Sequence, residues 1–178
     1  MKTLKAIITI CIVLVIFSCD NTESTPIDTN AQENDLVGTW SLTEITQDGT
    51  VTTNVQGVPV NANYTSFGKN IDAQVTFSQN PNNFSSSGTF TSVITITLVG
   101  QATTREVPIV IDDVLSQGTW QVDQGVITLS QNNETQTVNI TELTDTSLKF
   151  ELELQQDVVI QGVNSTVQTL AKLSFLKQ

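Results

Sequence analysis

The sequence contains no histidine, only 2 cysteines and one arginine, Arg105. Without histidine the chain can form neither a Ser-His-Asp nor a Cys-His catalytic centre, and it lacks the commonest metal ligand. Cysteine cannot take over, because Cys11 lies in an N-terminal apolar segment and Cys19 directly follows that segment. If the segment is removed and Cys19 is modified, no thiol remains for a disulfide, a zinc site or a nucleophile. We therefore expect a protein that is not an enzyme and that uses no cofactor.

Basic residues are also scarce: 7 lysines and arginines stand against 18 aspartates and glutamates. Loss of the N-terminal segment would remove Lys2 and Lys5, which leaves five basic residues and a net charge of −13. Nucleic acids are bound by clustered lysine and arginine, and the sequence has no such cluster. The composition thus excludes nucleic acid as a partner, and the acidity is expected to keep the domain soluble.

The N-terminus has the pattern of a signal peptide. Two lysines precede an apolar run from Ala6 to Phe17, which is too short to cross about 30 Å of hydrocarbon as a helix. A basic start and about 7–15 apolar residues are typical of a secretory signal. The small residue Ser18 precedes Cys19, so we place the signal peptide at residues 1–18. The alternatives are an ordinary signal peptide with an incidental cysteine and a retained membrane helix.

The rest of the chain divides into a tether and one domain. Residues 19–35 are polar and acidic and contain almost no large apolar side chain. Such a segment cannot bury enough surface to offset its ordering entropy, so we expect a flexible acidic tether. Residues 36–178 have the length of a typical single domain and can bury a sizeable core.

Apolar residues in this domain alternate with polar ones, and no long stretch shows helical periodicity. In "LKFELEL" every second residue from Leu148 is apolar, and "TFTSVITITL" places Phe90, Ile94, Ile96 and Leu98 on one face. This period of two predicts strands with one dry face. Turn-forming stretches separate the strands: "QDGT" at Gln47, "QNPNN" at Gln79, "VGQA" at Val99, "VDQGV" at Val122, "SQNNET" at Ser130 and "LTDTS" at Leu143. We predict an all-β, antiparallel up-and-down barrel of roughly eight to ten strands of about 8–12 residues, with a β-sandwich as the alternative.

The dry face supplies the candidate site. Its members are Trp40, Leu42, Val75, Phe77, Phe90, Ile94, Ile96, Leu98, Trp120, Phe150 and Leu152. They could line a pocket for a small molecule or fill a plain core, because alternation does not distinguish the two. None of them is charged, so we expect any ligand to be largely apolar.

Acidic pairs offer little chemistry. Asp112 and Asp113 are adjacent, and adjacent strand residues point to opposite faces, so the two carboxylates are poorly placed to share a proton. They are expected to end a strand or begin a loop. No loop matches the EF-hand spacing, and no metal site is predicted.

Short motifs carry two resemblances. "IFSC" at Ile16 to Cys19 resembles the lipobox of bacterial lipoproteins, although Phe17 stands where that family prefers a smaller residue. The resemblance implies that Cys19 is lipidated and becomes the new N-terminus. Two or more acyl chains would hold the protein permanently on a membrane surface.

"LVGTW" with Gly38 and Trp40, and the later "GTWQVDQGVITLS" with Gly118 and Trp120, resemble the lipocalin signature and its setting. With the signal, the acidic tether and "ITELTDTSLKFELEL", the layout is similar to bacterial lipocalin-like lipoproteins common in the Bacteroidetes. This implies a lipocalin-like barrel in the cell envelope, lipid-anchored at the outer membrane and binding a small apolar ligand. The alternative is a non-catalytic surface or protein-interaction lipoprotein with a solid core.

One feature departs from the lipocalin pattern. In typical lipocalins an arginine from a late strand packs over the signature tryptophan. Arg105 is mid-chain here, and we expect the last strands to offer only Lys149 and Lys172. We therefore expect the closed base of the barrel to be built differently.

Overall fold

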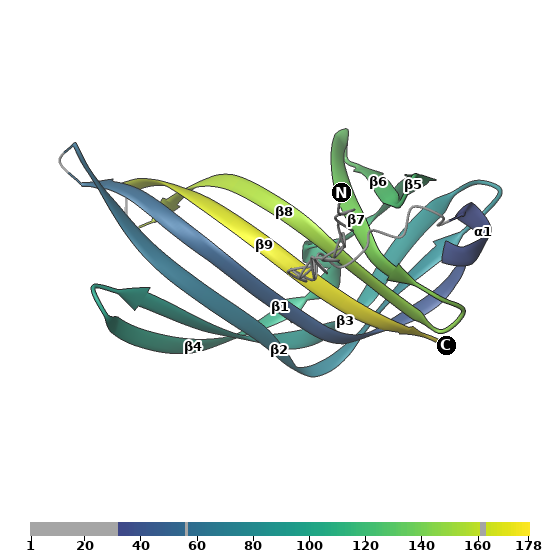
Figure 1. Cartoon of the computed structure of the whole chain (residues 1–178), viewed down its shortest axis with the longest axis horizontal. Helices are drawn as coiled ribbons and strands as arrows, with labels where there is room; N and C mark the ends of the chain where they lie inside the picture. Colours follow the sequence, from purple (N-terminus) through teal and green to yellow (C-terminus); the bar gives the residue numbers. More distant parts are fainter. Residues whose placement is uncertain (1–31, 56, 161–162) are drawn as a thin grey trace, which may run out of the picture.

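The computed structural model describes residues 32–55, 57–160 and 163–178 (Figure 1). The signal peptide, Cys19 and most of the tether lie outside the described residues. The described elements are α1 Glu33–Leu36, β1 Gly38–Val55, β2 Val58–Ser78, β3 Asn83–Leu98, β4 Gln101–Val110, η1 Ile111–Asp113, β5 Gln117–Asp123, β6 Val126–Gln131, β7 Glu134–Leu143, β8 Ser147–Ile160 and β9 Val163–Lys177.

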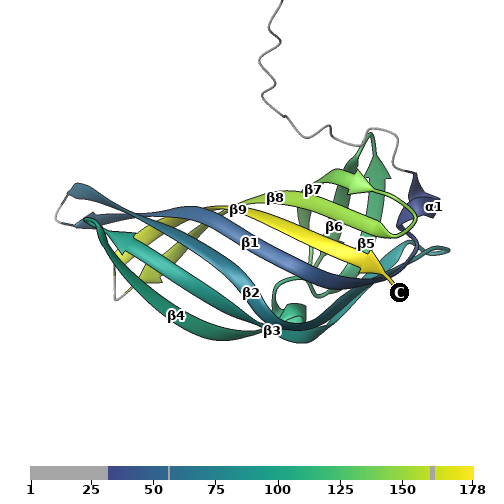
Figure 2. The ribbon, with the colours of Figure 1, turned by 60° about the horizontal axis from the view of Figure 1, so that its bottom comes forward.

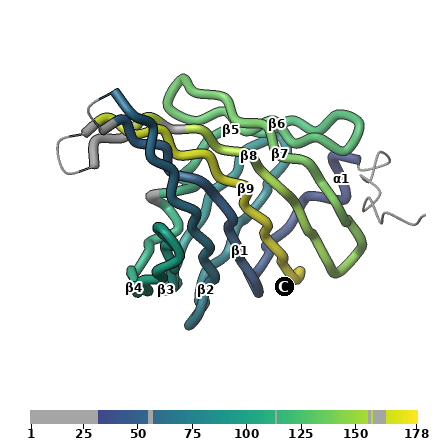
Figure 3. Tube along the Cα trace, turned by 60° about the vertical axis from the view of Figure 1, so that its left-hand side comes forward, coloured from purple at the N-terminus to yellow at the C-terminus, as the bar shows by residue number. Residues whose placement is uncertain are grey.

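The nine strands form one antiparallel sheet that bends into a nearly closed ring. Hydrogen-bonded neighbours follow the order β2, β1, β9, β8, β7, β6, β5, β3 and β4, and β2 also pairs with β3. Because β2 pairs with β3, the strands β4, β3, β2, β1, β9 and β8 follow one another along one side of the ring, as Figure 3 shows. The ring confirms the predicted all-β antiparallel barrel over the two-sheet sandwich, and closure removes most of the exposed sheet edges.

Strand β3 changes its partner along its length. Residues 83–85 pair with residues 117–119 of β5, whereas residues 89–98 pair with residues 101–110 of β4. On the other side, β8 pairs with β7 only as far as Glu151, but with β9 as far as Ile160. The ring is therefore closed at one end only. We call the end with α1 and β5 to β7 the closed end, and the extension of β1 to β4, β8 and β9 the open end (Figures 1 and 2).

The closed end is filled by a hydrophobic core. The Phe77 ring meets the Trp120 ring edge-on with centroids 5.7 Å apart, and the Phe150 and Phe175 rings lie 5.1 Å apart. Their neighbours include Trp40, which is fully buried. Close packing of aromatic and aliphatic side chains from all sides of the ring is the main source of stability here.

Helix α1 begins inside the segment that we assigned to the tether. Gln32 and Asp35 form a capping box, and Leu36 is buried in the core. The Trp40 indole Nε1 donates to the Leu36 carbonyl oxygen at 2.8 Å. Ordered structure thus starts before residue 36, because the helix places Leu36 over the signature tryptophan.

The prediction of a turn at "QDGT" is wrong. The "QDGT" stretch lies within β1, which continues to Val55, and the connection to β2 follows Val55 instead. Gly49 is paired on both sides, with Tyr64 and with Thr169. A Cβ at Gly49 would overlap the Tyr64 ring, so this glycine makes room for a side chain rather than forming a turn. Strands here are also longer than expected, up to 21 residues in β2.

Candidate functional site

The candidate site residues fall into two groups. The first group is buried in the core of the closed end: Trp40, Leu42, Val75, Phe77, Phe90, Trp120 and Phe150. The second group lies on the same face but toward the open end: Ile94 and Leu152 are half-buried, and Ile96 and Leu98 are 41% and 45% exposed. Alternation thus predicted which side chains share the inner face of the sheet. The structure shows that this face is packed in the core at the closed end and accessible at the open end.

Two rows of directly paired residues cross the open end. Residues opposite each other in an antiparallel pair point to the same side of the sheet, so each row shares the face of the core. The row nearer the core consists of Arg105, Ile94, Ser66, Gln47, Ala171 and Leu152. The farther row consists of Thr103, Ile96, Tyr64, Gly49, Thr169 and Leu154. We call the surface formed by these two rows the inner face of the open end.

Exposure along β3 rises with distance from the closed end. Phe90 is buried, Ile94 is half-buried, and Ile96 is exposed, although all three point to the same side. Val107 on β4 faces the same way, opposite Ser92, and is also exposed. The core of the barrel therefore continues into apolar surface that a ligand could reach.

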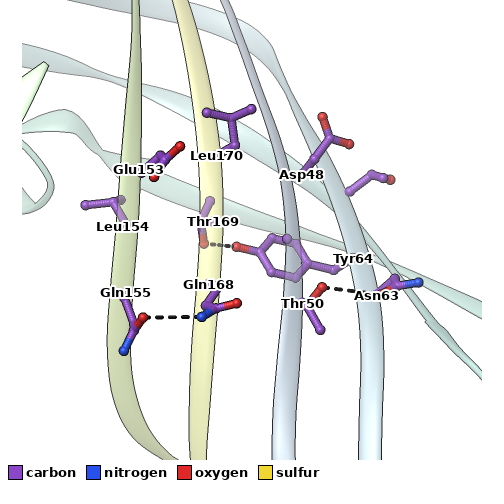
Figure 4. Close-up of a pocket in the computed structure, with 12 residues that line it drawn as sticks. Asp48, Thr50, Asn63, Tyr64, Glu153, Leu154, Gln155, Gln168, Thr169 and Leu170 are labelled. Carbon is purple, nitrogen blue, oxygen red and sulfur yellow. Dashed lines mark hydrogen bonds between the residues drawn. The ribbon is translucent and has the colours of Figure 1, made fainter. Parts of the chain in front are cut away.

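A recess of about 780 Å³ spans β8, β9, β1 and β2 at the farther row (Figure 4). Its lining residues are Asp48, Gly49, Thr50, Asn63, Tyr64, Thr65, Glu153, Leu154, Gln155, Gln168, Thr169 and Leu170. The Tyr64 ring reaches from β2 across Gly49, and its hydroxyl is hydrogen-bonded to the Thr169 hydroxyl on β9. This contact holds three strands together where the ring of strands is no longer closed.

Neutral hydrogen bonds dominate the polar part of the inner face. The Ser66 hydroxyl, which is buried, donates to Gln47 Oε1 at 2.9 Å. Beyond Gly49, the Thr53 and Ser165 hydroxyls are 2.8 Å apart. These groups are satisfied by one another, so they can border an apolar ligand without a desolvation cost for unpaired donors.

Arg105 is the one charged side chain in the two rows. It lies directly opposite Ile94, and the next residue, Glu106, lies opposite Val93 on the outer side. Sequence reasoning missed Arg105 because both of its neighbours, Thr104 and Glu106, are polar, so alternation does not reveal which way it points. Arg105 thus adds a charged residue to a face for which the sequence analysis named only uncharged residues.

At the closed base, the cation over Trp40 is Lys177, which the sequence analysis did not name. Lys177 Nζ lies 5.0 Å from the centroid of the Trp40 ring. A lysine at this distance from an indole face stabilises the arrangement through a cation–π interaction. The prediction that the last strands offer only Lys149 and Lys172 is wrong, because Lys177 also lies in β9, and Lys149 and Lys172 each pair with a glutamate. The base is thus closed by the last residues of β9.

The second Gly-Thr-Trp stretch also ends in a buried indole. Trp120 Nε1 donates to the carbonyl oxygens of Ser78 and Asn83 at 3.0 and 3.1 Å. Each tryptophan thus fixes one chain segment at the closed end: Trp40 fixes α1, and Trp120 fixes the β2–β3 connection. These contacts give both tryptophans a structural role.

The carboxylates form no candidate centre in the described part of the chain. Asp112 lies in η1, directly after the end of β4. The acidic pair thus follows the end of a strand, as the sequence predicted. Within the described ranges, no group of three or more histidine, cysteine, aspartate or glutamate side chains is placed to hold a metal ion. The helices among these residues are not long and apolar enough to cross a membrane.

A nearly closed antiparallel ring of strands with a filled base and an accessible inner face belongs to the class of small antiparallel β-barrels. The family model described as "Lipocalin-like domain" matches residues 36–150, and the chain belongs to this family. The match ends within β8, before β9 supplies the strand that completes the ring. No curated protein matches the chain.

Proposed function

We propose that this protein binds a small, largely apolar ligand on the inner face of the open end. The observation that carries the proposal is the gradient along β3, where Phe90 belongs to the core and Ile96 is exposed on the same face. The nearby recess of about 780 Å³ has the size of a small-molecule site, which is typically about 300–1,000 Å³. Because side chains fill the closed end, the open end is the favoured position for the ligand.

We further propose that the protein is a lipoprotein of the cell envelope, anchored through acylated Cys19, with the outer membrane as the expected location. The sequence "IFSC" after a short apolar run supports this. The chain enters the domain at α1, at the closed end, and the open end lies on the opposite side (Figure 1). An anchor before α1 would thus leave the inner face of the open end accessible.

Ligand binding is tested by filling the inner face. Ile96→Trp adds a large side chain to the farther row and should weaken binding of a fluorescent fatty-acid analogue at least about tenfold. Phe67→Trp is the matched control, because Phe67 is also exposed but lies opposite Val93 on the outer side. It should leave affinity unchanged. Equal affinity in both variants, at unchanged melting temperature, would contradict the proposed position.

Anchoring is tested by Cys19→Ala. The wild-type protein should carry acyl chains by mass spectrometry and sediment with membranes, and the variant should do neither. A soluble wild-type protein without lipid would refute the anchor.

A non-catalytic protein-interaction lipoprotein is the second candidate. The filled barrel and the exposed outer residue Phe67, which is 52% exposed, favour it. If a panel of fatty acids, isoprenoids and sterol-like compounds leaves the melting temperature of the wild-type protein unchanged, and the fluorescent fatty-acid analogue does not bind to it, the assignment shifts to this function.

A further inference from the structure

Arg105 is the one cation in the two rows, and the other members of these rows are uncharged. Its row partners are Ile94 and, beyond it, Ser66, and the farther row is uncharged throughout. In the part of the chain that the structure describes, no hydrogen bond or ion pair involves the Arg105 guanidinium. Arg105 is exposed, so its guanidinium is accessible and its N–H donors are free to bind an anion.

The other basic residues of the domain are all engaged. Lys69 pairs with Glu106 at 2.5 Å, Lys149 with Glu142 at 2.7 Å, and Lys172 with Glu151 at 3.0 Å. The fourth lysine, Lys177, lies over Trp40. Glu106 is next to Arg105 in sequence, but it points to the outer side and binds Lys69. The strand geometry thus places Arg105 and the adjacent Glu106 on opposite faces of the sheet.

We propose that Arg105 binds the anionic head group of an amphiphile whose apolar chain lies along Ile94 and Ile96. This rests on the proposed function and names the ligand class: a carboxylate or phosphate monoester joined to an aliphatic chain. The guanidinium offers a planar fork of N–H donors that matches both head groups. The neutral hydrogen bonds of Ser66 and Tyr64 leave no competing anion in the two rows.

Three matched ligands test this: dodecanoate, dodecyl phosphate and dodecan-1-ol, which share one chain and differ in head group. Their dissociation constants are measured by calorimetry for the wild type, Arg105→Gln, Arg105→Lys and Lys69→Gln. The wild type should bind at least one anionic ligand about tenfold more tightly than the alcohol, since hydrogen bonds to charged groups are the stronger ones. The anion with the larger preference identifies the head group.

Arg105→Gln should abolish this preference while the affinity for dodecan-1-ol stays unchanged. Arg105→Lys keeps the charge without the fork and should retain part of the preference. Lys69→Gln removes an equal charge from the outer side and should retain all of it. Melting temperatures of the Arg105 variants should match the wild type, because Arg105 is exposed and unpaired. Lys69→Gln breaks an ion pair between exposed side chains and should change the melting temperature little.

The experiment distinguishes a failure of the head-group assignment from a failure of the proposed function. If acids and alcohol bind equally, or if Arg105→Gln keeps the preference, the head-group assignment is wrong and the apolar site stands. If none of the three ligands binds the wild type, the proposed function fails and the role of Arg105 with it.

Discussion

Replacement of Phe175 by alanine tests whether β9, which lies outside the family match, closes the barrel. Phe175 is 1% exposed, pairs with Leu42 and Leu148 on either side, and stacks against Phe150. Truncation of a buried phenylalanine costs about 3–5 kcal/mol. That is a large part of the roughly 5–15 kcal/mol by which a domain is stable. Leu176→Ala, the next residue on the opposite face, is the control; Leu176 is 52% exposed and should cost below about 1 kcal/mol.

The assay is urea unfolding of the chain without residues 1–18. The fluorescence of Trp40 and Trp120 monitors the transition. At a slope of about 2 kcal/mol per molar urea, Phe175→Ala should lower the midpoint by about 2 M, and Leu176→Ala by less than about 0.5 M. Similar midpoints for the two variants would refute the register of β9 and with it the closure of the ring.

The remaining predictions concern two ion contacts. Lys177→Met should destabilise the domain by about 0.5–1 kcal/mol in urea unfolding, because it removes the cation over Trp40, and Lys177→Arg should not. The pKa of Glu142 lies below its usual value of 4.5, because Lys149 and Ser147 donate hydrogen bonds to its carboxylate, and burial opposes this only weakly. A lowered folded-state pKa stabilises the fold above the unfolded-state value, and the contribution is lost as the pH falls through the folded-state value. Glu142→Gln should therefore cost under about 1 kcal/mol at pH 7, and the difference should vanish in acid; a constant difference across this range would contradict the assignment.

Period-two alternation predicted the faces of the strands correctly. Phe90, Ile94, Ile96 and Leu98 do share one face, and Trp40 and Trp120 are both buried. Alternation succeeds here because side chains in a strand point to opposite sides at every step, whatever the neighbouring strand is.

The division of that face depends on strand pairing, which local sequence does not encode. Ile96 is accessible because β3 extends beyond its short pairing with β5, and Phe90 is buried because it lies nearer that pairing. Arg105 belongs to the face only because it pairs with Ile94. Gly49 resembles a turn residue in sequence, and only the Tyr64 ring across it shows why glycine is required.

The position of the ligand is the central claim, and methyl NMR during a dodecanoate titration tests it most directly. Methyl groups of Ile94, Ile96 and Leu154 should shift, while those of Val75, Ile127 and Val138, which are buried at the closed end, should not. Shifts confined to the buried group, or no shifts at all at saturating dodecanoate, would contradict a ligand site on the inner face of the open end.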